Sequence, residues 1–375
     1  MEKKRVLAVG MSPHAGGIET FLYRSIEAFQ KLPLRFDILT ACERCAYEKE
    51  LKEMGVGVYH VARRGNAPMK SYLDKRRFFL ERGQAYDAIW LHVSSASDIS
   101  SIRLAKKYTH ARIICHSHSV SFESRGGVIR FVHMLLHKKN RAELVKLCDV
   151  CAAVTKEAGD WLYGDIGDCL VVLKNGADTE KFRFDTGVRR AARQSLGIED
   201  KTVIGHVGRL VPVKNQRFLI DVFDAFHRKH PDSVLLIAGD GELYSELMVY
   251  AAQKGLAESV RFLGFRNDIP ALLQAFDVFA LPSLFEGFPL VLVEAQSAAL
   301  PCVASENITR SIAATQYILF CPLGEPPEFW AKEMESALRL RRDATGVQEA
   351  LERAGLTETA AQKRLFSILY GEETP

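Results

Sequence analysis

The chain has 375 residues, a formal net charge of +4 and 47% hydrophobic residues. This length is too great for one comfortable hydrophobic core and predicts two domains of a soluble protein. The charged start, Met1–Arg5, is not followed by the hydrophobic segment of a signal peptide, and no run reaches the apolar length needed to cross a bilayer. We therefore expect a cytoplasmic protein rather than a secreted or membrane-spanning one.

The charge is spread unevenly along the chain. Residues 1–178 contain 28 Lys and Arg against 20 Asp and Glu, whereas residues 179–375 contain 22 against 26. A basic first half could contact an anionic membrane surface or an anionic acceptor. Random scatter of charges over solvated faces is the alternative.

Short apolar runs alternate with helix-like segments in both halves of the chain. In the first half the runs are Val6–Val9, Phe36–Thr40, Val56–Val61, Ala88–Val93, Arg112–Cys115, Val150–Val154 and Leu170–Leu173. In the second half they are Val203–Val207, Val234–Ala238, Val260–Leu263, Val278–Leu281 and Pro301–Ala304. Strands separated by helices at this interval predict a parallel, doubly wound sheet. We expect an α/β protein with Rossmann-like domains at 1–178 and 201–357, joined by a polar, Arg-rich hinge at 179–200.

The strongest functional pattern lies in the stretch Leu281–Glu294. Two acids, Glu286 and Glu294, flank a turn after an apolar strand. Pro289 is expected at the first position of the following helix, and the apolar run Leu290–Leu300 continues that helix. Backbone amides at the positive end of a helix form a natural seat for phosphate. The amides at this seat are those of Gly287, Phe288 and Leu290, and Pro289 lies between them as a further candidate donor-binding residue. We expect Glu286 to accept hydrogen bonds from sugar hydroxyls and Glu294 from ribose hydroxyls; two unrelated surface acids are the alternative.

Two cations, Arg209 and Lys214, follow another apolar strand. A planar guanidinium and an ammonium group suit a diphosphate, whose charge they would neutralise as a nucleoside diphosphate departs. If the protein supplies this charge, no metal ion is needed, and we expect no cofactor. Two solvated loop cations are the alternative.

Two pairs of glycines lie at predicted strand–helix turns. Gly16 and Gly17 would let backbone amides approach a phosphate or an acceptor closely, although glycines at such turns also serve geometry alone. Gly239 and Gly241 match only part of a dinucleotide fingerprint, because the third glycine is missing. A nicotinamide cofactor is therefore not expected, and these two glycines are candidate neighbours of a nucleotide.

Two histidines, His116 and His118, follow a short apolar strand of the first half. Side chains at the carboxyl ends of parallel strands face the crevice where ligands bind, and alternation along the strand would point both the same way. The pair could bind zinc, but no third ligand can be named from the sequence. A purely structural role is the other alternative.

The acids Glu286 and Glu294, with Gly-Phe-Pro after the first, resemble the Glu-x7-Glu motif of retaining glycosyltransferases of family 4, which have the GT-B fold. The segment Gly208–Asn215 is similar to the donor loop of that family, and Gly16-Gly17 to its acceptor-side loop. The resemblance implies two Rossmann-like domains facing each other across a cleft and a last helix, 358–375, that packs back on the first domain. It also implies retention of anomeric configuration and a contact of His116 or His118 with the transferred sugar.

The later segment, from Ser305–Arg310 to Cys321–Pro327, is most similar to bacterial exopolysaccharide and capsule transferases of family 4. This similarity implies an acceptor glycan carried on a lipid diphosphate. The helix-like segment Arg130–Arg141 mixes apolar and basic residues, which predicts either contact with a membrane surface or a core helix with a basic outer face.

The eight cysteines include two pairs with the spacing of zinc or redox sites, Cys42/Cys45 and Cys148/Cys151. The pairs are about a hundred residues apart and lack glycine-rich knuckles. We expect buried free thiols in a reducing cytosol.

These features predict an enzyme that moves a hexose-type sugar from a nucleotide-diphosphate sugar to an acceptor hydroxyl, with retention. We expect it in the cytoplasm or at the inner face of the cell membrane, with no nucleic-acid partner. A sugar-nucleotide epimerase of the same fold and a catalytically inactive glycan- or nucleotide-binding protein are the alternatives.

Overall fold

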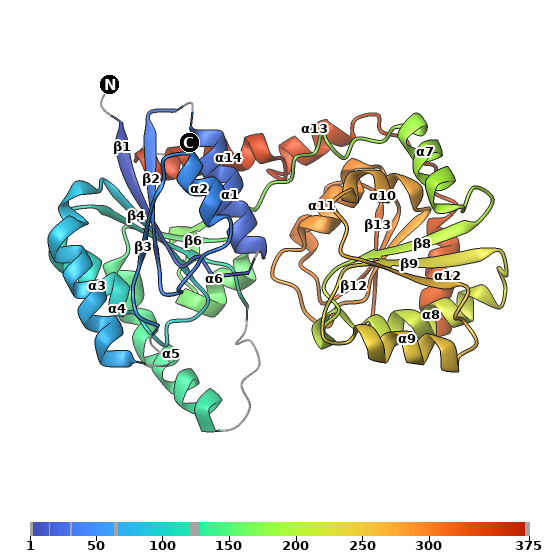
Figure 1. Cartoon of the computed structure of the whole chain (residues 1–375), viewed down its shortest axis with the longest axis horizontal. Coiled ribbons are helices and arrows are strands. Elements are labelled where there is room, and N and C mark those ends of the chain that lie inside the picture. The colour runs from blue at the N-terminus through green and yellow to red at the C-terminus, as the bar shows by residue number, and fades with distance from the viewer. Residues whose placement is uncertain (1–2, 15, 31, 64–66, 121–127, 372–375) are drawn as a thin grey trace. The chain divides into compact units, whose positions relative to one another are not determined.

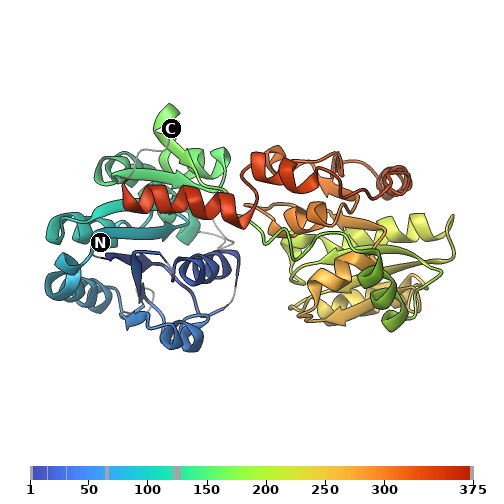
Figure 2. The same cartoon turned by 90° about the horizontal axis from the view of Figure 1, so that it is seen from above.

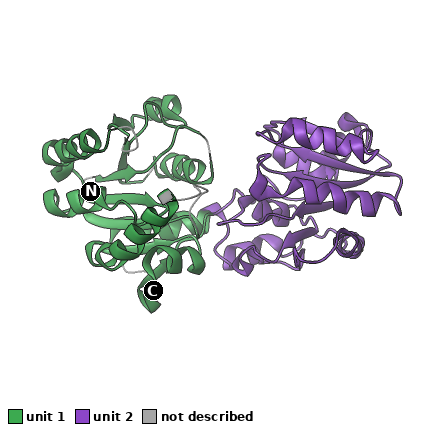
Figure 3. Cartoon of the chain, turned by 90° about the horizontal axis from the view of Figure 1, so that it is seen from below, with its two compact units in different colours: residues 1–175, 359–375 green, residues 176–358 purple. Residues whose placement is uncertain are grey.

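The protein forms two compact α/β units, one of residues 1–175 with 359–375 and one of residues 176–358 (Figure 3). Figure 1 shows this computed structural model, which describes residues 3–14, 16–30, 32–63, 67–120 and 128–371.

The first unit is built on a seven-stranded parallel sheet with the strand order β3-β2-β1-β4-β5-β6-β7. Its strands are β1 (Lys4–Val9), β2 (Leu34–Thr40), β3 (Gly57–His60), β4 (Ala88–Val93), β5 (Arg112–Ser117), β6 (Val150–Ala153) and β7 (Leu170–Val172). Its helices are α1 (Gly17–Phe29), α2 (Glu48–Glu53), α3 (Pro68–Arg82), α4 (Ser100–Tyr108), α5 (Val128–Leu147), α6 (Lys156–Tyr163) and α14 (Glu358–Tyr370). Successive residues of β1 enter different cores: Val6 and Ala8 face one and Leu7 the other. Helices therefore bury both faces of this sheet.

The C-terminal helix α14 packs on the first unit, where Figure 2 shows it in red. Leu365, Ile368 and Leu369 enter the same hydrophobic core as helix α1. Lys4 Nζ also donates a hydrogen bond to the carbonyl oxygen of Tyr370 at 2.6 Å. The two ends of the described chain are thus joined in one unit.

The second unit repeats this architecture with six parallel strands in the order β10-β9-β8-β11-β12-β13. Its strands are β8 (Thr202–Val207), β9 (Ser233–Ala238), β10 (Val260–Gly264), β11 (Val278–Leu281), β12 (Cys302–Ser305) and β13 (Ile318–Cys321). Its helices are α7 (Thr186–Leu196), α8 (Gln216–His227), α9 (Tyr244–Gln253), α10 (Ile269–Ala275), α11 (Leu290–Ser297), α12 (Pro327–Ala337) and α13 (Val347–Arg353). Val203 and Ile204 of β8 enter separate cores, so this sheet is also covered on both faces.

The predicted fold class, two Rossmann-like doubly wound domains, is confirmed, and the differences are local. Strand β13 was not predicted from the sequence. The helix predicted at Leu290–Leu300 ends at Ser297. The segment predicted as a hinge, 179–200, contains α7 and contributes Phe182 and Ile198 to the core of the second unit.

The cysteines and the amphipathic segment can now be placed. All eight cysteines are free thiols; Cys45 and Cys151 are buried, while Cys42 and Cys148 are partly exposed. Helix α5 holds the segment predicted to be amphipathic, and four of its apolar side chains are between 45% and 64% exposed: Ile129, Phe131, Val132 and Leu135. None of the described helices combines the length and apolar character that a membrane span requires.

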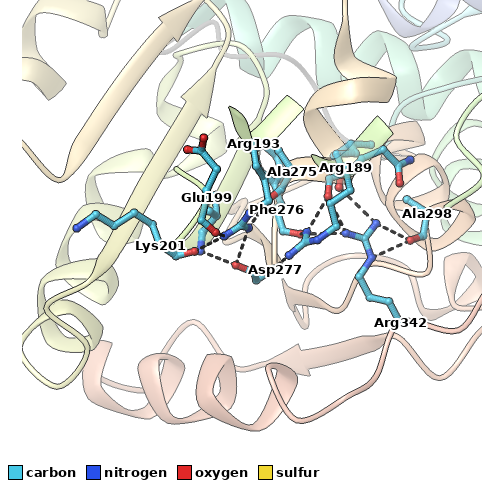
Figure 4. A network of polar contacts seen from close by, with 12 residues as sticks. Arg189, Arg193, Glu199, Lys201, Ala275, Phe276, Asp277, Ala298 and Arg342 are labelled. Carbon is cyan, nitrogen blue, oxygen red and sulfur yellow. Dashed lines mark hydrogen bonds and ion pairs between the residues drawn. The ribbon is translucent and has the colours of Figure 1, made fainter. Parts of the chain in front are cut away.

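Three arginines converge at the amino end of β11, around Asp277 (Figure 4). Arg189 and Arg193 of α7 form ion pairs with the Asp277 carboxylate, and the Val203 amide donates to the same carboxylate at 2.8 Å. Arg342 donates to main-chain carbonyl oxygens, among them that of Ala298 at 2.6 Å. The arginines that suggested a polar hinge therefore fasten α7 to the sheet.

Asp277→Ala should destabilise the second unit, because it leaves the Arg193 side chain, only 11% exposed, without its counter-charge. Loss of one partner of a buried ion pair costs about 3 kcal/mol of unfolding free energy. Chemical denaturation followed by circular dichroism measures this loss. The control is Asp232→Ala, which breaks an ion pair with Lys201 whose side chains are 87% and 41% exposed, and little change is expected there. Equal effects of the two substitutions would contradict the role given to Asp277.

Candidate functional site

Two loops leave neighbouring strands at the centre of the second sheet. β8 pairs directly with β11, and at this point the strand order changes direction. Open parallel sheets bind their ligands at such a switch point, beyond the carboxyl ends of the strands. The loop after β8 carries Arg209 and Lys214, and the loop after β11 carries Glu286.

Main-chain and side-chain hydrogen bonds hold these two loops together. The Leu284 amide donates to the Val213 carbonyl oxygen at 2.8 Å, and Asn215 Nδ2 donates to the Pro282 carbonyl oxygen at 3.2 Å. Asn215 has a left-handed backbone, with φ of 56°, a conformation that asparagine tolerates better than most residues. The loops therefore have a defined mutual geometry.

The structure brings Lys214 and Glu286 into direct contact. Lys214 Nζ lies 2.5 Å from Glu286 Oε1, and Ser283 Oγ donates to the same oxygen at 2.7 Å. The Lys214 and Glu286 side chains are 16% and 13% exposed, and Ser283 is fully buried. Both of these contacts use Oε1, so Oε2 retains its capacity to accept a hydrogen bond from a ligand.

Arg209 has a different environment from Lys214. Its residue is exposed, and within the described parts of the chain its guanidinium makes no hydrogen bond or ion pair. Its backbone is nevertheless fixed, because Gln216 Nε2 donates to the Arg209 carbonyl oxygen at 2.7 Å. The loop thus offers an exposed cation on an ordered backbone.

A buried histidine beneath this loop was missed by the sequence analysis. His206 of β8 is fully buried, and its Nδ1 lies 2.9 Å from the Ala280 carbonyl oxygen in β11. Because that oxygen can only accept, Nδ1 carries the proton and Nε2 accepts from Gln216 at 3.3 Å. Burial lowers the pKa of His206 to about 4, so the ring is neutral. The sequence did carry one sign of this residue, because His206 is a polar residue inside the apolar run Val203–Val207.

The two glycines after β9 allow close packing against the loop after β8. A Cβ atom on Gly239 would lie 2.0 Å from the Gly208 carbonyl oxygen, and one on Gly241 would lie 2.4 Å from that of Leu210. Gly239 also has a φ of +139°, which side chains rarely allow. These contacts give both residues a structural role in shaping the loop that carries Arg209.

Helix α11 begins one residue later than predicted. Pro289 is its N-cap rather than its first residue, and Leu290 opens the helix. Gly287 and Phe288 lie partly exposed in the preceding loop, and Glu294, also partly exposed, is the fifth helical residue. The start of α11 and Glu294 therefore follow Glu286 in one continuous loop and helix.

The glycine pair of the first unit stands at the start of α1. Gly16 is the N-cap and Gly17 the first residue. A Cβ atom on Gly16 would lie 2.9 Å from Glu19 Oε2, whereas one on Gly17 would meet nothing within 4 Å. The Glu19 side chain, which was not predicted, lies at the positive end of α1 and accepts from the Ser12 amide at 3.1 Å. A carboxylate therefore already lies at this helix start.

The two predicted histidines lie beside a third. His92 of β4 stands opposite His116 of β5 in the sheet register, and His118 follows two residues later. His92 Nδ1 and His118 Nε2 are 2.8 Å apart, whereas His116 is fully buried. Burial lowers the pKa of His116 to about 3, and burial together with the neighbouring rings lowers the pKa values of His92 and His118. All three rings are therefore neutral near pH 7.

Comparison with known proteins identifies two matching family models. Residues 188–340 match the group 1 glycosyl transferases, and residues 15–181 match glycosyltransferase family 4. The putative glycosyltransferase EpsF of Bacillus subtilis (strain 168) is 31% identical over 342 residues, which cover 89% of this chain and 88% of that protein. The UDP-Gal:alpha-D-GlcNAc-diphosphoundecaprenol alpha-1,3-galactosyltransferase of Escherichia coli is 29% identical, covering 81% and 79%.

Solved structures share the fold. Anabaena Alr3699/HepE in complex with UDP has a TM-score of 0.79 at 21% identity, covering 98% of this chain and 100% of that one. WaaG, a glycosyltransferase involved in lipopolysaccharide biosynthesis, has a TM-score of 0.74 at 15% identity, covering 98% and 100%. The named relatives are transferases, so the epimerase and inactive-protein alternatives are not favoured. The chain belongs to the family 4 glycosyltransferases and has their GT-B fold.

Proposed function

We propose that this glycosyltransferase moves a hexose from a nucleotide-diphosphate sugar to an acceptor hydroxyl with retention of anomeric configuration. The observation that carries this proposal is the contact of Lys214 with Glu286 at the switch point of the second sheet. It places a cation suited to phosphate next to a carboxylate suited to sugar hydroxyls. The UDP and UDP-glucose complexes of Anabaena HepE support a nucleotide-sugar donor.

The donor would be held by groups of the second unit. Arg209 is the exposed cation available to the diphosphate, and Lys214 has two ammonium hydrogens left after its bond to Glu286. The amides at the start of α11 would complete the phosphate seat, and Glu294 would accept from the ribose. Glu286 Oε2 would orient the sugar.

The first unit would supply His116 or His118 to the transferred sugar, and Gly16 and Gly17 to the acceptor. A neutral imidazole can orient a hydroxyl without adding charge.

The reaction itself needs no covalent nucleophile. The bond between the anomeric carbon and the phosphate oxygen breaks, and the acceptor oxygen bonds to that carbon on the same face. The acceptor proton passes to the departing phosphate oxygen, so the products are the glycoside and the nucleoside diphosphate. Glu286 contacts a lysine and a serine rather than a second acid, which favours this route over a pair of carboxylates.

We infer an acceptor glycan on a lipid diphosphate, in exopolysaccharide or capsule biosynthesis. The name of the Escherichia coli relative specifies a diphosphoundecaprenol-linked sugar. EpsF, the other relative described above, is 31% identical and covers 89% of this chain. The exposed apolar residues of α5, with Arg130, Lys138 and Lys139 on the same helix, would bring the enzyme to the inner face of the membrane.

Glu286→Gln should lower kcat by roughly 100-fold, because the amide loses both the Lys214 ion pair and the charge that strengthens its bond to a sugar hydroxyl. Release of nucleoside diphosphate in the presence of acceptor measures this loss. Glu325→Gln is the control, since Glu325 is exposed in the same unit. Near-normal turnover of Glu286→Gln would contradict its proposed role.

Arg209→Ala should raise the KM for the donor by roughly 10-fold, because one charge-assisted contact to phosphate is lost. Initial rates at varied donor concentration measure this KM, and an unchanged KM would contradict the role proposed for Arg209.

Transfer by the unmodified enzyme should continue in excess EDTA, since protein cations neutralise the diphosphate. Initial rates measured with and without EDTA test this statement. Complete loss of transfer in EDTA would show that a metal ion, rather than Arg209 and Lys214, neutralises the leaving group.

Replacing Phe131 and Leu135 together by serine should weaken sedimentation of the enzyme with anionic phospholipid vesicles, because these side chains are 64% and 52% exposed on a basic helix. The matched control is Val249→Ser on α9 of the second unit, a residue that is 57% exposed. If both variants sediment like the unmodified enzyme, α5 is not the membrane contact.

A further inference from the structure

Three imidazole rings lie close enough together in the first unit to share one ion. One ring nitrogen from each of His92, His116 and His118 lies within 4.8 Å of the others. Sheet geometry accounts for this, because His92 and His116 are register partners on adjacent strands and His118 projects from the same face as His116. Among the described residues, this is the one group of three histidine, cysteine or acidic side chains with that spacing.

The hydrogen bonding of the cluster is incomplete. His92 Nδ1 and His118 Nε2 bond to each other, but His92 Nε2 and both ring nitrogens of His116 have no partner of normal hydrogen-bond geometry among the described residues. The main chain of Leu173 lies close enough to His116 to raise its pKa against the larger effect of burial, but it does not form a hydrogen bond of normal geometry. His116 is fully buried, and unpaired buried polar atoms are costly and uncommon in native proteins. A group that engages these nitrogens is therefore expected.

The surroundings make an ion a better occupant than a hydrogen-bonding side chain. The rings of Phe21 and Trp90 pack on His116, with centroids 5.9 and 6.1 Å away, and offer no conventional acceptor at their faces. Each neutral imidazole offers one lone pair to a metal ion.

A cavity reaches one member of the cluster, His92. His92 lines a cavity of about 290 Å³ at the carboxyl ends of β1 and β4, together with Gly10, Ser95 and Asp98. This is the switch point of the first sheet, where the strand order turns between β1 and β4.

We propose that His92, His116 and His118 bind one divalent late transition-metal ion, with Zn²⁺ the preferred occupant. Imidazole nitrogen suits Zn²⁺, Ni²⁺ and Cu²⁺ and does not suit Mg²⁺ or Ca²⁺, which take oxygen ligands. Three protein ligands leave a fourth position of a tetrahedral ion for water or a substrate oxygen. Binding replaces the His92–His118 hydrogen bond with coordination.

The ion is expected to inhibit sugar transfer, a consequence that rests on the proposed function. His116 or His118 would contact the transferred sugar there, and a nitrogen that coordinates zinc cannot also bond a hydroxyl. The cluster would then be an inhibitory metal site: the enzyme transfers sugar when the site is empty and is inhibited when the ion is bound.

Isothermal titration of tag-free, EDTA-treated, dialysed protein with Zn²⁺ tests the site directly, and Co²⁺ titration gives the visible absorption bands of a tetrahedral nitrogen site. We expect one ion per chain. His118→Gln and His92→Gln should each weaken binding at least roughly 10-fold, because each removes one ligand. The control is His110→Gln, a change at an exposed residue outside the cluster.

The variants keep all eight cysteines. Any zinc that binds to thiols therefore binds equally in every sample, and only zinc bound by the histidine cluster differs between the variants and the unmodified protein. Circular dichroism melting shows whether each variant folds. Absence of Zn²⁺ binding by the unmodified protein, or equal affinity of the folded His118→Gln variant, overturns the proposal.

The inhibitory role has its own measurement. Zn²⁺ should slow nucleoside diphosphate release by the unmodified enzyme and slow the His92→Gln variant only at a concentration roughly 10-fold higher. If Zn²⁺ binds without inhibiting the enzyme, the inhibitory role is wrong, but the proposal of a metal site stands. Failure to find any transferase activity counts against the proposed function and does not touch the binding result.

Discussion

The candidate site of the second unit depends on the ion pair of Lys214 with Glu286. The two residues are 72 positions apart in the chain, and both side chains are largely withdrawn from solvent. Loss of either partner would leave a charge with little water to solvate it, so the pair strongly favours one arrangement of the loops after β8 and β11. The ordering of these loops is thus completed during folding, and a ligand does not have to supply that free energy.

The layer beneath these loops is arranged to keep that geometry. His206 links β8 to β11 through the Ala280 carbonyl oxygen, and Gln216 ties the ring to the backbone of Arg209. Gly239 lets the next loop approach so closely that any side chain there would displace the Gly208 carbonyl. The hydrogen bonds of His206 and Gln216 and the close contact at Gly239 therefore all help to fix the backbone that carries Arg209.

Much of this site could be predicted from the sequence, because its signals are local. Glu286 and Glu294 lie in one strand–turn–helix segment, and Arg209 and Lys214 lie in another. The pairing of Lys214 with Glu286 could not be assigned, since it depends on which strands are neighbours. His92 was missed for the same reason, because beside Trp90 it reads as the end of an ordinary core strand until the register places it opposite His116. The partner of the α7 arginines could not be assigned either, because composition does not show that Asp277 neutralises two of them.

The two switch points differ in how completely their polar groups are satisfied. At the second, Ser283, Lys214 and His206 all have partners and Gln216 donates two hydrogen bonds, although the buried Oε1 of Gln216 has no partner among the described residues. At the first, His116 is buried with neither ring nitrogen in a normal hydrogen bond among the described residues. Natural proteins tolerate such local inconsistency chiefly where a ligand or a function resolves it. The same Rossmann-like architecture therefore carries an ordered pair of a cation and a carboxylate in one unit and, in the other, a histidine cluster whose bonding an ion would complete.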